Sequence, residues 1–275
     1  MPRISRLALA IVSTALALMQ LGAAQAQTAP GTTPPALAAR LNHPVAPALL
    51  EQLEQASAAG LQLATRPMPV DVTEIQGASL GKPPVLLYVG ADFCPYCASQ
   101  RWGLLLTLLR FGRLTGVHYM LSSASDVYAN TATFTFQFSR YTSPYLRFQA
   151  FETADRDQQS LMPMTPQATA IFQTYDVPPY AHFSYGIPFV YLNGAYLLTV
   201  PMISPASLQD LSWEQIAAQL ADPRSALFRA TMPQVNLLSA AICRVDGHQP
   251  ARICTAPGVI AADGSLSGLA GMMLR

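Results

Sequence analysis

The sequence predicts an α/β fold in which a central mixed sheet is flanked by helices, with an insertion between the two halves of the fold and a C-terminal helical extension. Three observations carry this prediction. A Cys-x-x-Cys motif, Cys94 to Cys97, stands between an apolar run typical of a buried strand and a segment typical of a helix. Strand-like and helix-like segments alternate along much of the chain. Two apolar runs flank Asn193-Gly194, which is a strong hairpin signal.

Composition excludes several classes of protein. The 275 residues are 51% hydrophobic and 11% charged, which argues against an intrinsically disordered chain. The formal net charge is +1 and no long basic run is present, so nothing indicates a nucleic-acid partner. The length fits one domain with extensions.

The N-terminus predicts a secretory signal peptide over residues 1–26. Arg3 and Arg6 precede an apolar stretch from Leu7 to Leu21, and Ala24-Gln25-Ala26 fits a cleavage site. We therefore expect a periplasmic or secreted protein. The alternative is an uncleaved N-terminal membrane anchor, for which the apolar stretch is shorter than the about 20 residues that a span needs.

Behind the signal peptide, the sequence divides into a short tether, one domain and a tail. Residues 27–45 begin with a stretch rich in Pro, Thr and Ala and are expected to form a flexible tether. Residues 46–260 are expected to form the domain, and residues 261–275 a tail.

The first half of the domain is expected to contain two helices and a buried strand. Residues 47–59 carry an amphipathic helical pattern, and residues 61–75, interrupted by two prolines, are expected to be extended with an edge strand. Residues 85–89 predict the buried strand. Residues 98–111 predict the helix that follows the cysteines.

The middle of the chain is expected to hold the insertion, over about residues 123–164. Residues 117–121 predict the next strand of the fold, before the insertion. Within it, residues 133–138 alternate strictly between apolar and polar, and residues 145–151 are a further strand candidate. Residues 165–175 predict a helix.

The last part of the domain is expected to be a hairpin followed by helices. Strands are predicted over 187–192 and 195–200, and helices over 204–220 and 223–241, whereas 244–258 is expected to be a loop. The whole order is strand, Cys-x-x-Cys, helix, strand, insertion, helix, Ile-Pro strand, hairpin and helix. That order is typical of a thioredoxin-like fold.

The residues around the cysteines also carry a family resemblance. Residues 87–102 resemble a thioredoxin-like family of prokaryotic proteins catalogued as domain of unknown function 929. Other stretches fit the same pattern: Arg110-Phe111-Gly112, Ser122 to Tyr128, Tyr141-Thr142-Ser143, Ile187 to Val190, and Ala241-Ile242-Cys243 with Gln249 to Cys254. The resemblance spans about residues 79–257. It implies a thioredoxin-like fold and thiol redox activity, without a defined substrate.

Cys94 and Cys97 are the predicted catalytic residues. At a helix start, unpaired N–H groups and the helix dipole stabilise a Cys94 thiolate, which is the reactive form of cysteine. Cys97 would then resolve the mixed disulfide. The alternatives are an inert disulfide, which would stabilise little because its loop is so short, and a metal site.

Ile187, Pro188, Phe93 and Tyr96 are the predicted substrate-binding residues. By the resemblance, Pro188 is a cis-proline beside the cysteines, and the backbone of Ile187 pairs with substrate. The alternative is a trans-proline that opens an edge strand. Phe93 and Tyr96 are expected to form an apolar surface for an extended polypeptide.

Cys243 and Cys254 form the second cysteine pair. In an oxidising compartment, an even number of cysteines favours disulfides, so we expect either a structural bridge or a second redox disulfide that relays electrons to Cys94 and Cys97. A four-cysteine zinc site is a third option, for which the spacing is unusual.

The sequence therefore predicts an exported thiol–disulfide oxidoreductase. Its partners would be protein thiols or disulfides and a membrane-bound or soluble redox partner, and we expect no cofactor and no metal. The alternative is a thioredoxin-like binding module that carries copper or docks a protein without turnover. Asp92 is a candidate for proton transfer, or else a solvated carboxylate. No acid lies within residues 85–89, so no buried proton acceptor is expected beneath the cysteines.

Overall fold

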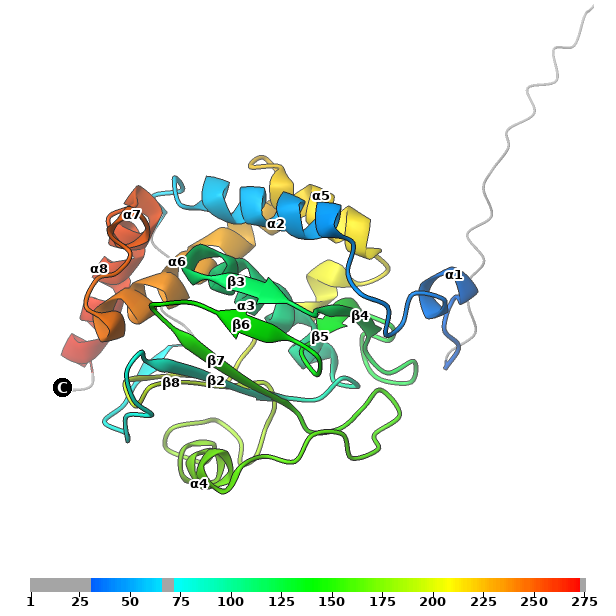
Figure 1. Ribbon diagram of the computed structural model, residues 1–275, viewed down its shortest axis with the longest axis horizontal. Helices are drawn as coiled ribbons and strands as arrows, with labels where there is room; N and C mark the ends of the chain where they lie inside the picture. The colour runs from blue at the N-terminus through cyan, green and yellow to red at the C-terminus, as the bar shows by residue number, and fades with distance from the viewer. Residues whose placement is uncertain (1–30, 66–71, 273–275) are drawn as a thin grey trace, which may run out of the picture.

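A five-stranded mixed sheet forms the centre of the protein (Figure 1). The computed structural model describes residues 31–65 and 72–272, so the predicted signal peptide lies outside the described residues. The strands follow the order β1 (Thr73–Glu74), β9 (Tyr196–Leu198), β8 (Phe189–Leu192), β2 (Val85–Gly90) and β7 (Arg147–Glu152).

The central strand β2 sets the register of the sheet. All six of its residues are buried, as expected for an apolar strand covered on both faces. It pairs antiparallel with β8 and parallel with β7. The predicted hairpin is confirmed: β8 and β9 are joined at Asn193 and Gly194, whose φ values of 46° and 85° are those that a tight hairpin turn requires.

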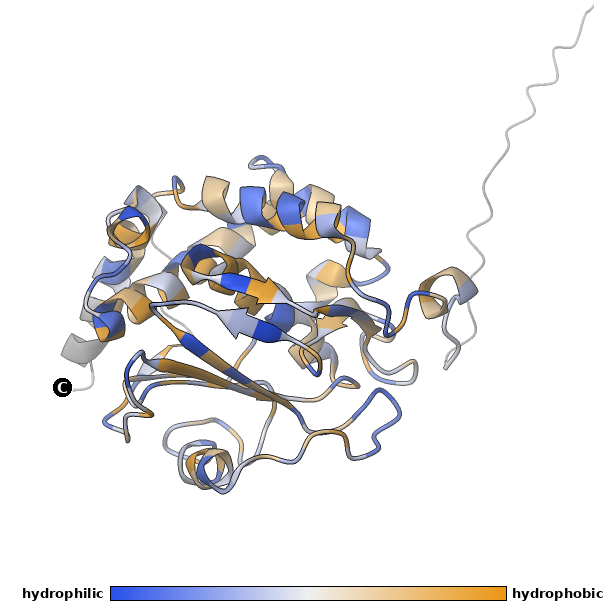
Figure 2. Cartoon of the chain, viewed as in Figure 1, coloured by the Kyte–Doolittle hydropathy of each residue, from blue (hydrophilic) through white to orange (hydrophobic). Residues whose placement is uncertain are grey.

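Helix α3 (Pro95–Phe111) packs on one face of this sheet and is buried on nearly all sides. Its run of leucines contacts β2 and β8 on one side, while α2 (Pro47–Gly60) and α6 (Ala226–Asp246) cover it on the other. Helix α4 (Pro166–Tyr175) covers the opposite face (Figure 1). Figure 2 shows the hydrophobic residues along the central strands between these layers. The predicted mixed sheet with flanking helices is therefore confirmed.

Two small antiparallel pairs lie outside the central sheet: β4 (His118–Leu121) with β5 (Ala132–Thr135), and β3 (Arg113–Thr115) with β6 (Arg140–Thr142). The strand predicted over 117–121 thus pairs with β5 instead of continuing the central sheet. The parallel neighbour of β2 is β7, from within the segment expected to be an insertion. Alternation identifies a strand but not its neighbour, which explains the difference.

The C-terminal part is more helical than the sequence predicted. The helix expected over 204–220 is split into a 3₁₀ turn, Pro205–Leu208, and α5 (Trp213–Ala221), because Asp210 has a φ of 60° and Ser212 caps α5 through a capping box with Gln215. The prediction of a loop over residues 244–258 is wrong.

In place of that loop, α6 continues to Asp246 and Gly247 ends it in a left-handed conformation. The short helix α7 (Ala251–Cys254) follows. The segment 261–275, expected as a tail, instead continues α8 (Pro257–Met272) through residue 272, with Ala262 and Leu266 in the core.

Residues 31–45, expected to be part of a flexible tether, are held against the domain. The backbone N–H of Val45 donates to the Val117 carbonyl at 2.9 Å. The Arg40 guanidinium lies 3.9 Å from the ring centre of Tyr119 and 4.8 Å from that of Trp213. The prolines of this segment accommodate a short helix, α1 (Pro35–Ala38).

Within residues 31–65 and 72–272, no helix is both long and apolar enough to span a membrane.

Cys243 and Cys254 form a disulfide with a Cα–Cα distance of 5.7 Å. It joins the last turns of α6 to α7, two helices separated by a turn at Gly247. A bridge across this turn restricts the unfolded chain, which is the usual way in which a disulfide stabilises a protein.

We expect the Cys243→Ala, Cys254→Ala double variant to lose roughly 3 kcal/mol of unfolding free energy, as the chain-entropy relation gives for so short a loop. Urea denaturation monitored by circular dichroism measures this loss. Cys94→Ala, which leaves the bridge intact, is the control. An unchanged midpoint in the double variant would show that the bridge contributes nothing to stability.

Candidate functional site

Cys94 is the N-cap of helix α3, at the carboxyl end of strand β2. Its Sγ accepts a hydrogen bond from the backbone N–H of Cys97 at 3.3 Å. Pro95 occupies the first helical position, where a missing N–H costs nothing. The strand, the proline and the cap together direct the Cys94 sulfur at the positive end of the helix dipole.

The two cysteines of the motif are free thiols in different surroundings. Cys94 is 6% exposed, whereas Cys97 is fully buried. The hydrogen bond between the two side chains lowers the pKa of Cys94, and the positive charge of Arg101 acts in the same direction. Burial raises the pKa of Cys97 well above its usual value. Cys94 is therefore the more acidic and more accessible thiol.

The substrate-binding residues predicted around Cys94 do surround it. The Ile187–Pro188 peptide bond is cis, and the Cys94 Sγ lies 3.8 Å from the Ile187 carbonyl oxygen. Phe93 is half-buried and Tyr96 is 41% exposed. The backbone of Ile187 thus lies beside the sulfur, at the residue that precedes the cis-proline.

A buried ionic cluster lies behind the cysteines, which the sequence analysis missed. Arg101 is fully buried, and its Nε and Nη2 donate to the two carboxylate oxygens of Glu152 at 2.9 and 2.6 Å. Glu152 also accepts the backbone N–H of Phe136 at 3.3 Å. One signal was available: Arg101 stands four residues after Cys97, and so on the same side of the helix.

Asp92 belongs to the same cluster, so the reading of it as a solvated carboxylate is wrong. It is 1% exposed, and its Oδ1 lies 3.3 Å from Arg101 Nη2. Burial, together with the charge of Glu152, raises the pKa of Asp92 to about 7. A buried proton acceptor therefore does lie near the cysteines, on the loop between β2 and α3.

Large apolar side chains are exposed around Cys94. Tyr96 contacts Tyr128 edge to face, with ring centres 6.1 Å apart, and the loop of Tyr128 is tied to the site by a hydrogen bond from Ser123 N–H to the Phe93 carbonyl. On the loop before Ile187, Phe183 is 81% and Tyr185 60% exposed. Sequence alone could not separate these side chains from core residues.

The bonded pair Cys243–Cys254 lies at the other end of the molecule. Arg110 follows Cys94 by sixteen residues, which corresponds to about 24 Å along helix α3. Its guanidinium donates a hydrogen bond to the Ser239 hydroxyl, and Ser239 lies one turn before Cys243. Arg244, next to Cys243, donates a hydrogen bond to the Tyr196 hydroxyl. Through Leu192, Tyr196 is level with Leu86 at the start of β2, whereas Cys94 follows the end of β2. Direct exchange between the two pairs would require a large rearrangement.

No group of three or more His, Cys, Asp or Glu side chains in the described parts of the chain is arranged to hold a metal ion.

A family model described as a domain of unknown function, DUF929, matches residues 68–244. No curated protein and no solved structure matches the chain.

Asp92 gives the stability of the protein a defined pH dependence. Because its pKa is raised from 3.8 to about 7 on folding, the folded protein binds more protons than the unfolded chain between these values. Its contribution is therefore fully present below about pH 4 and is lost as the pH rises through 7. We expect the unfolding free energy of the wild type to fall relative to that of Asp92→Asn as the pH rises over this range, because only the wild type must ionise a buried carboxyl. Urea titrations from pH 4 to 8 measure it, and a constant difference would contradict the assignment.

Proposed function

Because the chain belongs to DUF929, a domain family of unknown function, we propose its function from the geometry of its cysteines. The proposed function is that of an exported thiol–disulfide oxidoreductase, which acts on protein thiols and disulfides through Cys94 and Cys97. The single observation that carries this proposal is the position of Cys94. Its sulfur caps a helix, accepts a backbone N–H and lies beside the residue that precedes a cis-proline. Export follows from the signal peptide that the sequence predicts.

The reaction consists of two exchanges. The Cys94 thiolate attacks one sulfur of a partner disulfide, the partner's S–S bond breaks, and its other sulfur leaves as a thiolate that takes up a proton. Cys97 then loses its proton and attacks Cys94 Sγ, which releases the first partner sulfur. The partner gains two electrons and the Cys94–Cys97 disulfide forms. The same steps in reverse oxidise a partner dithiol.

We assign the proton of Cys97 to Asp92, which lies 3.3 Å from Arg101, the residue whose positive charge also acts on the Cys97 thiol. A buried thiol with a raised pKa needs an acceptor when it attacks, and a carboxylate whose pKa is about 7 can accept and return a proton near neutrality. Arg101, held by Glu152, keeps a positive charge near both sulfurs while they are thiolates.

The order of elements supports a thioredoxin-like fold for this site. Strands β9, β8, β2 and β7 are neighbours in that order, α3 follows β2, and α4 connects β7 to β8. In this arrangement the segment between α3 and β7, which forms β3 to β6, is the insertion. Its loop at Tyr128 borders Cys94.

The surroundings of Cys94 support a polypeptide substrate over a small thiol. A soluble protein rarely exposes several large apolar side chains together without a binding partner. Here Tyr96, Val127, Phe183 and Tyr185 are exposed on three segments that border the cysteine or the adjacent cis-proline. A polypeptide can cover such side chains on both sides of its own cysteine, whereas a small thiol cannot.

We expect purified protein to catalyse exchange with a disulfide-bonded model protein, and Cys94→Ser to abolish it. Cys97→Ser should instead accumulate a mixed disulfide with the partner, because the resolving thiol is missing. Insulin reduction and non-reducing electrophoresis measure the two outcomes. Cys243→Ala with Cys254→Ala is the matched control and should retain exchange.

The binding-module alternative makes the opposite prediction for the same samples. Tight Cu(I) binding by the dithiol without any exchange in the wild type would show that the site carries a metal and turns nothing over.

The alkylation rate of the reduced protein should report a Cys94 pKa below that of an ordinary thiol, because the hydrogen bonds and Arg101 favour its thiolate. Iodoacetamide labelling across pH 4 to 10, read by mass spectrometry, gives the profile. Cys97 should stay unlabelled in the folded protein because it is fully buried. A Cys94 profile equal to that of free cysteine would remove the basis of the proposed chemistry.

A further inference from the structure

The outer edge of the central sheet is open. Among the described strands, β7 has only β2 as a neighbour in the sheet, and β6, which precedes β7 in the chain, pairs with β3 instead. Strand β6 ends, and β7 begins, at a turn over residues 143–146, and the two strands diverge from this turn (Figure 1). An unpaired edge is a template on which another strand can add.

The backbone groups of Phe148 and Ala150 are directed toward this open side. The Arg147 N–H donates to the Pro84 carbonyl and the Thr153 N–H to the Gly90 carbonyl. The backbone groups of the odd-numbered residues of β7 are therefore directed toward β2. In a parallel ladder the even-numbered residues then point away from β2. One of them already accepts a partner there: the Glu152 carbonyl accepts Met162 N–H at 3.0 Å.

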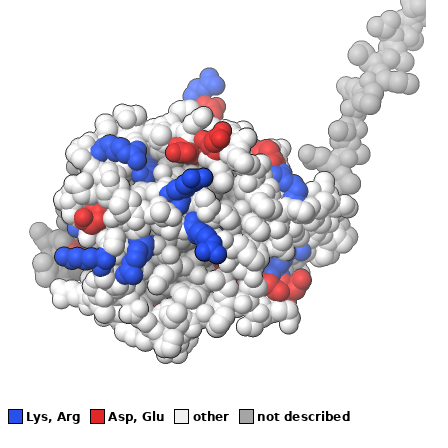
Figure 3. All heavy atoms as spheres, in the orientation of Figure 1, with Lys and Arg blue, Asp and Glu red and all other residues white. Residues whose placement is uncertain are grey.

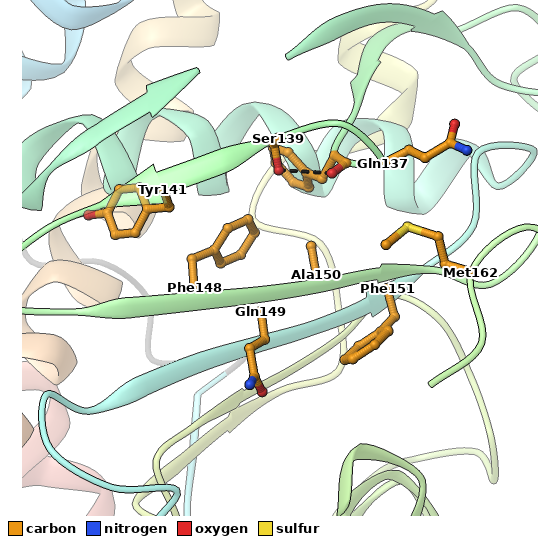
Figure 4. Close-up of a pocket in the computed structure, with 9 residues that line it drawn as sticks. Gln137, Ser139, Tyr141, Phe148, Gln149, Ala150, Phe151 and Met162 are labelled. Atoms are coloured by element: carbon orange, nitrogen blue, oxygen red, sulfur yellow. Dashed lines mark hydrogen bonds between the residues drawn. The ribbon is translucent and has the colours of Figure 1, made fainter. Parts of the chain in front are cut away.

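A cavity of about 250 Å³ lies between the diverging strands (Figure 4). Figure 4 shows Phe148 and Ala150 rising from β7 toward Ser139 and Tyr141, with Met162 at one end. Phe136 completes an aromatic wall, with its ring centre 5.1 Å from that of Phe148. The cavity therefore combines aromatic rings with the polar groups of Gln137 and Ser139 directly beside the unpaired edge, where a side chain of an added strand would enter.

Arginine side chains are exposed next to the cavity, on the face of β3 and β6 opposite to the one that lines it. Arg113 and Arg140 are exposed, and the β3–β6 register places them on the same outward face. Residues 127–151 include Arg140 and Arg147 and no Asp or Glu. Figure 3 shows Lys and Arg side chains over the middle of the face that carries these strands. A partner that lies here is favoured if it is acidic.

We propose that the β7 edge is a second binding site, independent of the cysteines, which takes an extended acidic segment of another polypeptide as an additional strand. Its backbone bonds the outward N–H and C=O groups of Phe148 and Ala150. One of its side chains enters the cavity beside Phe148, and its carboxylates approach Arg113 and Arg140 from the solvent side.

The test is selection from a random twelve-residue peptide library without cysteine, so that the outcome does not depend on thiol chemistry. Wild-type protein should enrich peptides in which apolar residues alternate with others and Asp or Glu is frequent. Synthetic copies should slow amide exchange of Phe148 and Ala150. Failure to enrich any peptide above the background of the Ala150→Pro variant would overturn the proposal.

Two variants at one position isolate the backbone contact. Ala150→Pro removes only an outward N–H and leaves the bonds to β2 intact, so it should weaken peptide binding about ten-fold or more, as measured by fluorescence anisotropy. Ala150→Ser keeps the N–H and should bind within about two-fold of the wild type. Equal binding by the proline variant would contradict strand addition.

A third variant does not depend on how the sheet tolerates proline. Arg113→Ser with Arg140→Ser changes only exposed side chains and should lower both the affinity and its salt dependence. Unchanged affinity would overturn the acidic partner. Binding of phosphatidylglycerol vesicles or poly(U) in place of peptides would show that the basic face serves a membrane or RNA, and would also overturn it.

Discussion

The buried ion pair between Arg101 and Glu152 is the interaction on which the site depends. Two charges removed from water are tolerated only when they pair closely, and here two hydrogen bonds of 2.9 and 2.6 Å join them. The pair fixes helix α3 to the end of β7, so that the first turn of the helix, with both cysteines, is held at the carboxyl edge of the sheet. A third ionisable group, Asp92, lies 3.3 Å from the same guanidinium, and burial raises its pKa to about 7.

The difference between the two thiols follows from this placement. Cys94 and Cys97 are the same residue type one turn apart, yet the Cys94 sulfur accepts a backbone N–H at the positive helix end, while Cys97 is fully buried. One thiol is therefore ready to ionise and the other holds its proton until an acceptor takes it. The chemistry that we propose needs this asymmetry, because attack and resolution are different steps.

The small strand pairs decide what the central sheet exposes. Residues 118–121 lie within a predicted strand of the fold, but they pair with β5, and residues 140–142 pair with β3. The indole N–H groups of Trp102 and Trp213 hold β5 through the carbonyls of Ala132 and Thr133. As a result β7 is left as an edge strand beside a cavity, and the loop of Tyr128 is brought to the rim of Cys94.

The sequence by itself determined the features that depend on neighbouring residues: the buried strand β2, the helix that starts at Cys94, the Asn193-Gly194 hairpin and the amphipathic helix α2. It also indicated, through a family resemblance, that Pro188 is cis and stands beside the motif. Only the tertiary structure decided that Arg101 meets Glu152, fifty-one residues away, that Asp92 is buried, and that β7 and not β4 pairs with β2. It also decided that residues 31–45 and 257–266 pack on the domain. The reason is physical: period, caps and turns are read within a few residues, whereas strand partners and buried charges are chosen by competition among distant segments for the same surface.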